Sequence, residues 1–105
     1  MPRFIVEREL PGAGALGTDA LRDIAERSND VLVGMSGRAQ WLESYVTDDR
    51  IICVYVAADP ESIREHGRIG GFPVTAIHRV VDVIDPTTAD ERPPAVRSRA
   101  DAAGA

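Results

Sequence analysis

Residues 44–56 read SYVTDDRIICVYV, two runs of β-branched and aromatic side chains separated by a polar break. Val, Ile and Tyr are enriched in strands, and Asp-rich breaks favour turns. The stretch therefore predicts a β-hairpin, with strands over residues 39–47 and 51–58. Cys53, the only cysteine of the chain, lies in the second strand.

The chain before the hairpin contains a strand and then a helix. Residues 3–10, RFIVEREL, alternate apolar and charged side chains as a half-buried strand does. Residues 18–34 predict a helix, with Thr18 as its N-cap and Gly34 at its end. Its apolar stripe comprises Leu21, Ile24, Ala25, Ser28, Val31 and Leu32.

A second helix and a last strand follow the hairpin. Residues 59–69 predict a helix, because Asp59 suits the N-cap, Pro60 suits the first helical position and a glycine pair follows. Residues 74–84, VTAIHRVVDVI, are rich in β-branched side chains and predict a strand. The order β-α-β-β-α-β predicts a ferredoxin-like α+β sandwich, a four-stranded antiparallel sheet with two helices on one face.

Length and composition divide the chain into two parts. The ferredoxin-like domain is expected over residues 1–88 of the 105. Residues 89–105 have no periodicity and contain a proline pair, so a disordered C-terminal tail is expected there.

The charge balance and the single cysteine exclude some partners and compartments. The net charge is −5 and no lysine is present, so affinity for nucleic acid or for an anionic membrane is not expected. No apolar run approaches the roughly 20 residues that span a bilayer, and the first residues carry charges where a signal peptide is apolar. One unpaired cysteine fits a reducing compartment, so the prediction is a cytoplasmic protein.

The length of the hairpin turn decides which side chains share a face of the sheet. A two-residue turn would place Glu43 beside apolar Val54, whereas a three-residue turn, opposing Thr47 to Ile51, separates charged from apolar side chains. We therefore predict the three-residue turn. One face, packed under the helices, then contains Leu42, Ser44, Val46, Ile52, Val54 and Val56, and the other contains Trp41, Glu43, Tyr45, Cys53 and Tyr55.

The same parity divides the first strand. Phe4 and Val6 belong under the helices, and Ile5, Glu7 and Glu9 belong on the open face with Cys53. A sheet face with this many aromatic and apolar side chains favours burial in a two-fold homodimer. Pairing through that face would enclose a cavity between two sheets.

Several motifs resemble a family of short actinobacterial proteins that are nickel-binding and nickel-responsive. The matching segments are MPRFIVERELPGAGAL, ERSNDVL, QWLESYVTDDRIICVYVAADPESIREH, GGFPV and VIDPTTA, and the resemblance covers roughly residues 2–89. The resemblance implies a ferredoxin-like homodimer that binds a divalent transition metal, nickel in the named members. The donor-bearing side chains at matching positions are Glu7, Glu9, Glu43, Tyr45, Cys53, Tyr55 and His66.

From these positions we predict a metal site for Ni(II) or another divalent transition metal. The predicted ligands are Glu7, Glu43, Cys53, Tyr55 and His66. Mixed sulfur, nitrogen and oxygen ligands suit Ni(II), Zn(II) and Cu(II). No HxxxH or CxxC spacing is present, so the site would be assembled across strands and even across subunits. His78 fits either face of the last strand.

Two other functions remain open at this stage. A small dimeric enzyme of the isomerase or monooxygenase type would use Glu43 or Glu7 as base and Tyr55 or Tyr45 as acid in the inter-sheet cavity. No nucleophile motif or His-Asp pair is present, which argues against this reading. A metal-free interaction module is the third possibility, with Cys53 as a small buried apolar residue.

Overall fold

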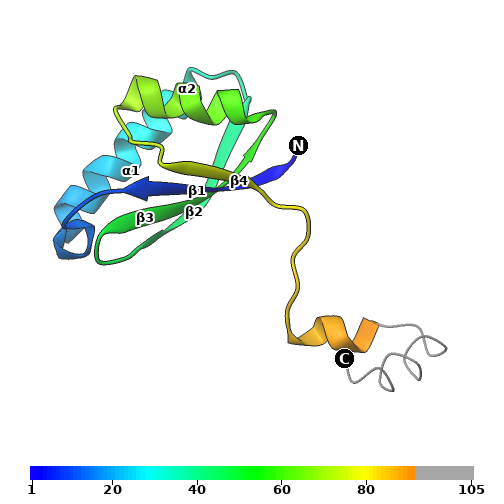
Figure 1. Ribbon diagram of the computed structural model, residues 1–105. Coiled ribbons are helices and arrows are strands. Elements are labelled where there is room, and N and C mark those ends of the chain that lie inside the picture. The colour runs from blue at the N-terminus through cyan, green and yellow to red at the C-terminus, as the bar shows by residue number, and fades with distance from the viewer. Residues whose placement is uncertain (92–105) are drawn as a thin grey trace.

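The computed structural model describes residues 1–91, which form a four-stranded sheet with two helices packed on one face (Figure 1). The strands are β1 (Arg3–Glu9), β2 (Ala39–Val46), β3 (Arg50–Ala57) and β4 (Ala76–Arg79). The helices are α1 (Thr18–Val33) and α2 (Pro60–Gly70), and two 3₁₀ turns are η1 (Ala13–Ala15) and η2 (Pro86–Glu91). The predicted β-α-β-β-α-β order is confirmed.

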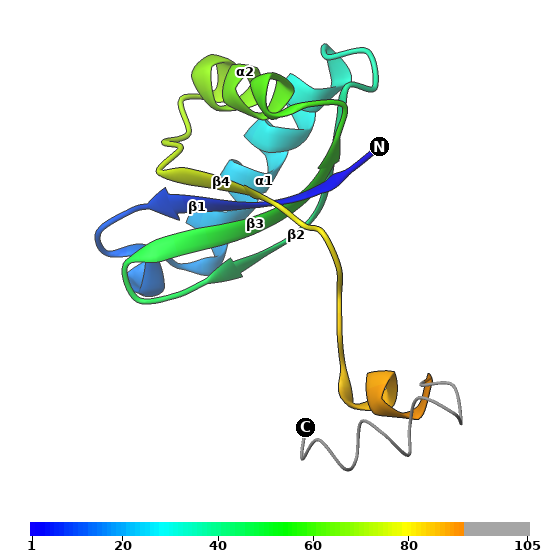
Figure 2. The same ribbon diagram turned by 45° about the vertical axis from the view of Figure 1, so that its right-hand side comes forward.

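The sheet has the ferredoxin-like strand order β2-β3-β1-β4. Every neighbouring pair, β2 with β3, β3 with β1 and β1 with β4, is antiparallel. Figure 2 shows α1 and α2 on the same side of the sheet, which leaves the opposite side uncovered. We call this uncovered side the open face.

The ends of α2 follow the sequence signals, whereas the start of α1 does not. Asp59 Oδ1 accepts a hydrogen bond of 2.8 Å from the Ser62 backbone N–H, and this bond lowers the pKa of the Asp59 carboxyl. Gly71, with φ 73°, ends α2 in the left-handed region that favours glycine. The N-cap of α1 is Gly17, without a side-chain hydrogen bond, so the assignment of Thr18 as N-cap is wrong.

Strand β4 is much shorter than predicted. Val80 N–H donates to Arg3 O at 2.8 Å, and β1 begins at Arg3, so no strand remains beyond this point for β4 to pair with. The chain then leaves the sheet, with Val81, Val83 and Ile84 exposed by 92%, 65% and 78%. Residues 89–91 lie within η2, and the rest of the predicted tail, 92–105, lies outside the described residues.

The hairpin turn is shorter than predicted, and this reverses the face of several residues. Thr47 N–H donates to Arg50 O at 2.9 Å, and Val46 lies opposite Ile51, so the turn has the two residues Asp48 and Asp49. A register shift between Trp41 and Glu43 marks a β-bulge in β2.

The assignment of β3 to the two faces was therefore wrong. Ile51, Cys53, Tyr55 and Ala57 are buried under the helices, and Ile52, Val54 and Val56 lie half-buried on the open face. In β2, Trp41 faces the helices instead of the open face, and Leu42, placed in the core, is 45% exposed at the bulge. Glu43 and Tyr45 lie on the open face and Ser44 and Val46 on the helix face, as predicted.

The faces of β3 were assigned wrongly because the apolar or polar character of its side chains does not by itself identify the buried side. Tyr55 is only 2% exposed, and its hydroxyl finds partners on Arg8 and His66 inside the protein. A buried hydroxyl with partners carries no large desolvation penalty. The valines of β3 could therefore take the open face.

The division of β1 is as predicted. Phe4 and Val6 are buried in the core, and Ile5, Glu7 and Glu9 lie on the other face. Arg8 has the same parity as Phe4 and Val6, and it too is buried, at 4% exposure.

Candidate functional site

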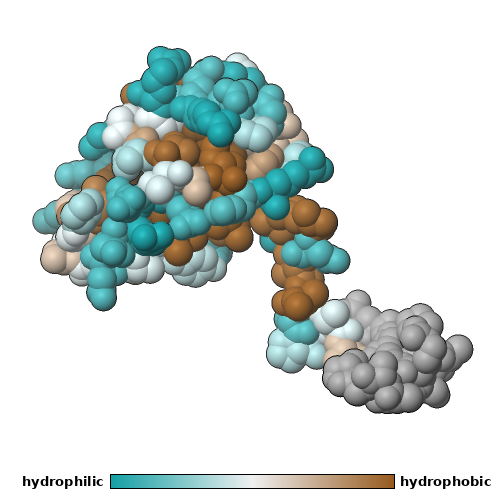
Figure 3. Space-filling model, in the orientation of Figure 1, coloured by the Kyte–Doolittle hydropathy of each residue, from teal (hydrophilic) through white to brown (hydrophobic). Residues whose placement is uncertain are grey.

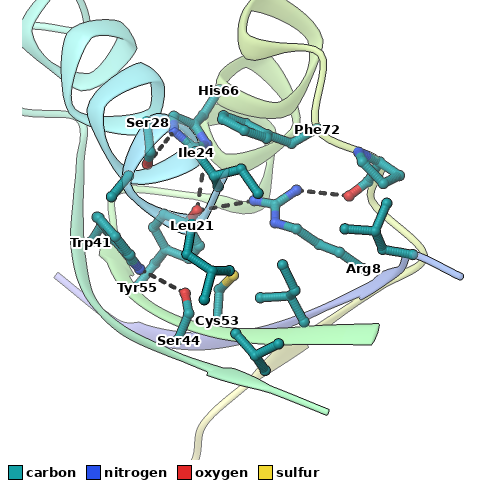
Figure 4. A pocket seen from close by; sticks show the side chains of 15 residues that line it. Arg8, Leu21, Ile24, Ser28, Trp41, Ser44, Cys53, Tyr55, His66 and Phe72 are labelled. Atoms are coloured by element: carbon teal, nitrogen blue, oxygen red, sulfur yellow. Dashed lines mark hydrogen bonds between the residues drawn. The ribbon is translucent and has the colours of Figure 1, made fainter. Parts of the chain in front are cut away.

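A chain of buried polar side chains connects the sheet to both helices. Arg8 of β1 donates from Nη2 to Tyr55 Oη at 3.0 Å and from Nη1 to Pro73 O at 2.8 Å. Tyr55 Oη lies 3.5 Å from His66 Nδ1, and His66 Nε2 lies 3.1 Å from Ser28 Oγ of α1. Figure 4 shows these contacts as one continuous line of dashed bonds.

The donors in this chain can be assigned by elimination. A guanidinium only donates, so Tyr55 Oη accepts from Arg8 and keeps its own proton for His66 Nδ1. The proton of a neutral imidazole then lies on Nε2, directed at Ser28. Desolvation first, and the nearby charge of Arg8 second, lower the pKa of His66, which favours this neutral form. Burial raises the pKa of the Tyr55 hydroxyl, so it stays protonated.

A cavity of about 240 Å³ opens between α1 and the helix side of the sheet (Figure 4). Its polar end is formed by Arg8, Tyr55 and His66, with Ser44 and Cys53 on its floor. Its apolar walls include Leu21, Ile24 and Ala25 of α1, Val46 and Ile51 of the sheet, and Phe72. Such a combination of apolar walls and few convergent polar groups is typical of small-molecule sites.

The structure places the predicted metal ligands on two sides of the sheet. Cys53, Tyr55 and His66 lie on the helix side, where Cys53 is 5% exposed and lines the cavity. Glu7 and Glu43 lie on the open face. The two groups cannot form one centre within a single chain, because the sheet lies between them.

The open face contains a carboxylate–imidazole pair instead. Glu7 Oε2 lies 2.7 Å from His78 Nε2, and Glu7 Oε1 accepts from Arg50 Nη1 at 2.9 Å. His78 is opposite Ile5 in the register of β1 and β4, which directs it to this face. The hydrogen bond from His78 is the main reason that the pKa of Glu7 is lowered.

The remaining open-face donors lie further along the sheet. Tyr45 donates a hydrogen bond to Glu43, and both side chains are exposed. Tyr45 is opposite Ile52, which is opposite Glu7, so a whole strand separates Tyr45 from Glu7. One acid–base pair considered for an enzyme, Glu7 with Tyr55, is separated by the sheet, because the two side chains lie on its opposite sides.

The donor sets differ in how well they fit a cation. Residues 1–91 contain no group of three or more His, Cys, Asp or Glu side chains placed to hold a metal ion. In the interior, the buried positive charge of Arg8 next to Tyr55 and His66 opposes a second cation. On the open face, Glu7 and His78 offer an oxygen and a nitrogen already within contact distance.

Sequence reasoning missed Arg8 and Ser28 as members of the site and left His78 unassigned. For Arg8 the signal was present, since residues 4, 6 and 8 alternate onto the face that Phe4 and Val6 define. Ser28 was placed on the inner stripe of α1, but its hydrogen bond to His66 depends on how α2 packs beside α1.

Fold and site together define a small ferredoxin-like α+β protein with a polar-ended apolar cavity under one helix. The chain belongs to the family described as "Nickel responsive protein SCO4226-like", which it matches over residues 4–80. Its fold is similar to a crystal structure of SCO4226 from Streptomyces coelicolor A3(2), with a TM-score of 0.65 and 14% identity, covering 78% of this chain and 99% of that chain. No curated protein matches the chain significantly.

None of the helices within residues 1–91 is both long and apolar enough to cross a bilayer.

Proposed function

We propose that the protein binds Ni(II), or a related divalent transition metal, and stores, buffers or senses it in the cytoplasm. Membership of a family described as nickel responsive supports a nickel-related role. The observation that carries the proposal is the contact of 2.7 Å between Glu7 Oε2 and His78 Nε2 on the open face. The reduced state implied by a single free cysteine fits a cytoplasmic protein.

Glu7 and His78 supply one oxygen and one nitrogen ligand from adjacent strands. Both are ordinary ligands for Ni(II), Zn(II) and Cu(II). Glu7 and His78 would hold the metal through one oxygen and one nitrogen once the proton of their hydrogen bond is lost, and Arg50 would still orient Glu7 through its other oxygen. Two ligands per chain are too few for a tight site, so further donors must come from water or a second subunit.

A homodimer formed through the open face supplies those donors and covers apolar surface. Ile5 and Tyr45 are exposed by 36% and 55% on this face, beside half-buried Ile52, Val54 and Val56. Figure 3 shows further apolar side chains in brown on the segment that leaves the sheet, where Val81 is 92% exposed. A two-fold axis presents every open-face residue twice, so a Glu7–His78 pair from each chain can meet.

Metal titration of histidine variants tests this proposal. Untagged protein is titrated with Ni(II), Zn(II), Co(II) and Cu(II) by calorimetry, for wild type, His78→Gln and His66→Gln. We expect His78→Gln to lose at least about tenfold in affinity, because even loss of an outer-shell partner typically costs about 10–100-fold, and we expect His66→Gln to bind normally. Absence of binding by wild type, or the opposite ranking of the two variants, contradicts the proposal.

The assembly is tested separately by sedimentation velocity. We expect a dimer at micromolar concentration, and a monomer when Tyr45→Arg introduces a charge into the open face. The dimer is contradicted if the wild type sediments as a monomer both in the absence and in the presence of Ni(II). An unchanged mass for Tyr45→Arg contradicts pairing through the open face.

A further inference from the structure

Arg8 is a buried charge without a counter-ion in the described chain. It is only 4% exposed, and no carboxylate of residues 1–91 forms an ion pair with it. Its hydrogen-bond acceptors are the neutral oxygens of Tyr55 and Pro73. Burying an ion without an opposite charge is costly, and natural proteins compensate such charges.

The neighbours of Arg8 reduce this cost without removing it. Its Cζ lies 5.8 Å from the centre of the Tyr55 ring and 5.6 Å from that of Phe72, distances at which cation–π attraction acts. All nitrogens of a guanidinium carry N–H groups, and the contacts above use only Nη1 and Nη2. Donor capacity and positive charge therefore remain for an anion.

The cavity begins at this guanidinium and continues along apolar side chains. Figure 4 shows Arg8 reaching toward Tyr55 at one end, with Leu21 and Ile24 projecting from α1 over the space. Leu21, Ile24 and Ala25 are only partly buried although they face the sheet. The cavity is therefore reachable from solvent along α1.

We propose that this cavity binds a small monocarboxylic acid with an apolar body. The carboxylate pairs with the Arg8 guanidinium, and the apolar body lies beneath α1 against Leu21 and Ile24. The proposal is independent of the metal, which we assign to the opposite side of the sheet.

Charge and size select this ligand class over other anions. One guanidinium beside a neutral His66 balances a single negative charge, whereas a phosphate dianion would leave net negative charge buried. A guanidinium also matches the planar carboxylate through two parallel hydrogen bonds. The volume of about 240 Å³ is below the roughly 300–1,000 Å³ of most ligand pockets, so the body is a short chain or a single ring.

Trp41 makes the binding measurable without a label. It is the only tryptophan of the chain, it lines the cavity, and its Nε1 donates to Ser44 Oγ at 2.8 Å. Phenylacetate and hexanoate are titrated against Trp41 fluorescence in the presence of EDTA, with phenylacetamide and hexanamide as neutral analogues. We expect at least one acid to bind about tenfold or more tightly than its amide, because only the acid offers a charge to Arg8.

Variants separate recognition by charge from simple occupation of space. Arg8→Met should abolish the preference for acid over amide, whereas Arg3→Met, an exposed position of the same strand, should keep it. Because Arg8→Met can destabilise the fold, a second pair is used. Ala25→Leu fills the cavity from α1 and should weaken binding of the acid about tenfold or more, while Ala20→Leu, outside the cavity lining, should not.

Protection of Cys53 gives an independent readout. Its thiol lines the cavity, so the bound acid should slow alkylation of Cys53 by iodoacetamide in wild type and not in Ala25→Leu. Equal affinity for acid and amide, or undiminished binding in Ala25→Leu, overturns the proposal. Millimolar acid that changes neither Trp41 fluorescence nor the alkylation rate of Cys53 also overturns it.

Discussion

Replacement of Tyr55 by phenylalanine tests the buried polar chain on which the site depends. The change deletes one oxygen and leaves the ring, so apolar packing is retained. That oxygen accepts a hydrogen bond of 3.0 Å from Arg8 Nη2 and lies 3.5 Å from His66 Nδ1. In Tyr55→Phe, the charged Arg8 side chain, which is 4% exposed, loses the acceptor of its Nη2 group.

The magnitude follows from the charge and burial of Arg8. A hydrogen bond to a charged group contributes about 1.5–3 kcal/mol, and a buried donor left without a partner costs a similar amount. We expect Tyr55→Phe to lower the free energy of unfolding by about 2 kcal/mol. For a domain of this size, each kcal/mol corresponds to roughly 4–8 °C, so Tm should fall by about 8–16 °C.

The other tyrosine of the chain provides a matched control. Tyr45 is 55% exposed and bonds to Glu43 at the surface, so Tyr45→Phe should stay within about 0.5 kcal/mol of wild type. Both variants are unfolded in urea and by heat, followed by circular dichroism, with the m-value required to stay constant. If Tyr55→Phe is no less stable than Tyr45→Phe, the reasoning about Arg8 is refuted.

The packing of the protein interior leads to two further predictions about stability. Desolvation and Arg8 lower the folded-state pKa of His66 below the ordinary 6.5, so the unfolded chain binds its proton first as pH falls. Stability should be complete above about pH 6.5 and decrease below it until the folded-state pKa is reached. Thermal melts above the range in which carboxyl groups titrate, about pH 4–5, should show this decrease in wild type and in His78→Gln, and a smaller one in His66→Gln. Equal slopes for both variants in that range would exclude His66 as the cause. At Gly67, an added Cβ would lie 2.9 Å from the Phe72 carbonyl oxygen, so Gly67→Ala should lower the free energy of unfolding by about 1–3 kcal/mol. At Gly34, the atom nearest to an added Cβ is 3.6 Å away, so Gly34→Ala should stay near wild type in the same melts. Equal Tm values for the two alanine variants would contradict the close packing at Gly67.

The local signals in the sequence were sufficient for the order and most limits of the elements. Asp59 as N-cap and the glycine at the end of α2 depend on contacts within a few residues, so they can be recognised without the fold. The face of each β1 residue also followed from alternation, since Phe4 and Val6 left only one inward side. That alternation was enough to place Arg8 inside, although its role could not be inferred.

The sequence was less informative about which side chains form a site. Glu7, Glu43, Cys53, Tyr55 and His66 were predicted as one ligand set, but the structure places Cys53, Tyr55 and His66 on the helix side of the sheet and Glu7 and Glu43 on the open face. Whether any of these five binds a metal stays a prediction. The contact of Glu7 with His78 joins residues 71 positions apart, and only the pairing of β1 with β4 brings them together.

The sequence by itself determined the ferredoxin-like order of elements, because helix and strand periodicity, caps and turns act over short distances. Only the tertiary structure decided which face of the sheet carries Cys53 and Tyr55. Two pairings of the hairpin strands were compatible with the amino-acid sequence, and they differ by one residue in turn length. Since side chains alternate along a strand, that single residue moves every side chain of β3 to the opposite face. Contacts between residues far apart in the chain select the observed pairing, because Arg8 and His66 provide hydrogen-bond partners for the buried Tyr55 hydroxyl. A bulge in β2 turns Trp41 to the same side.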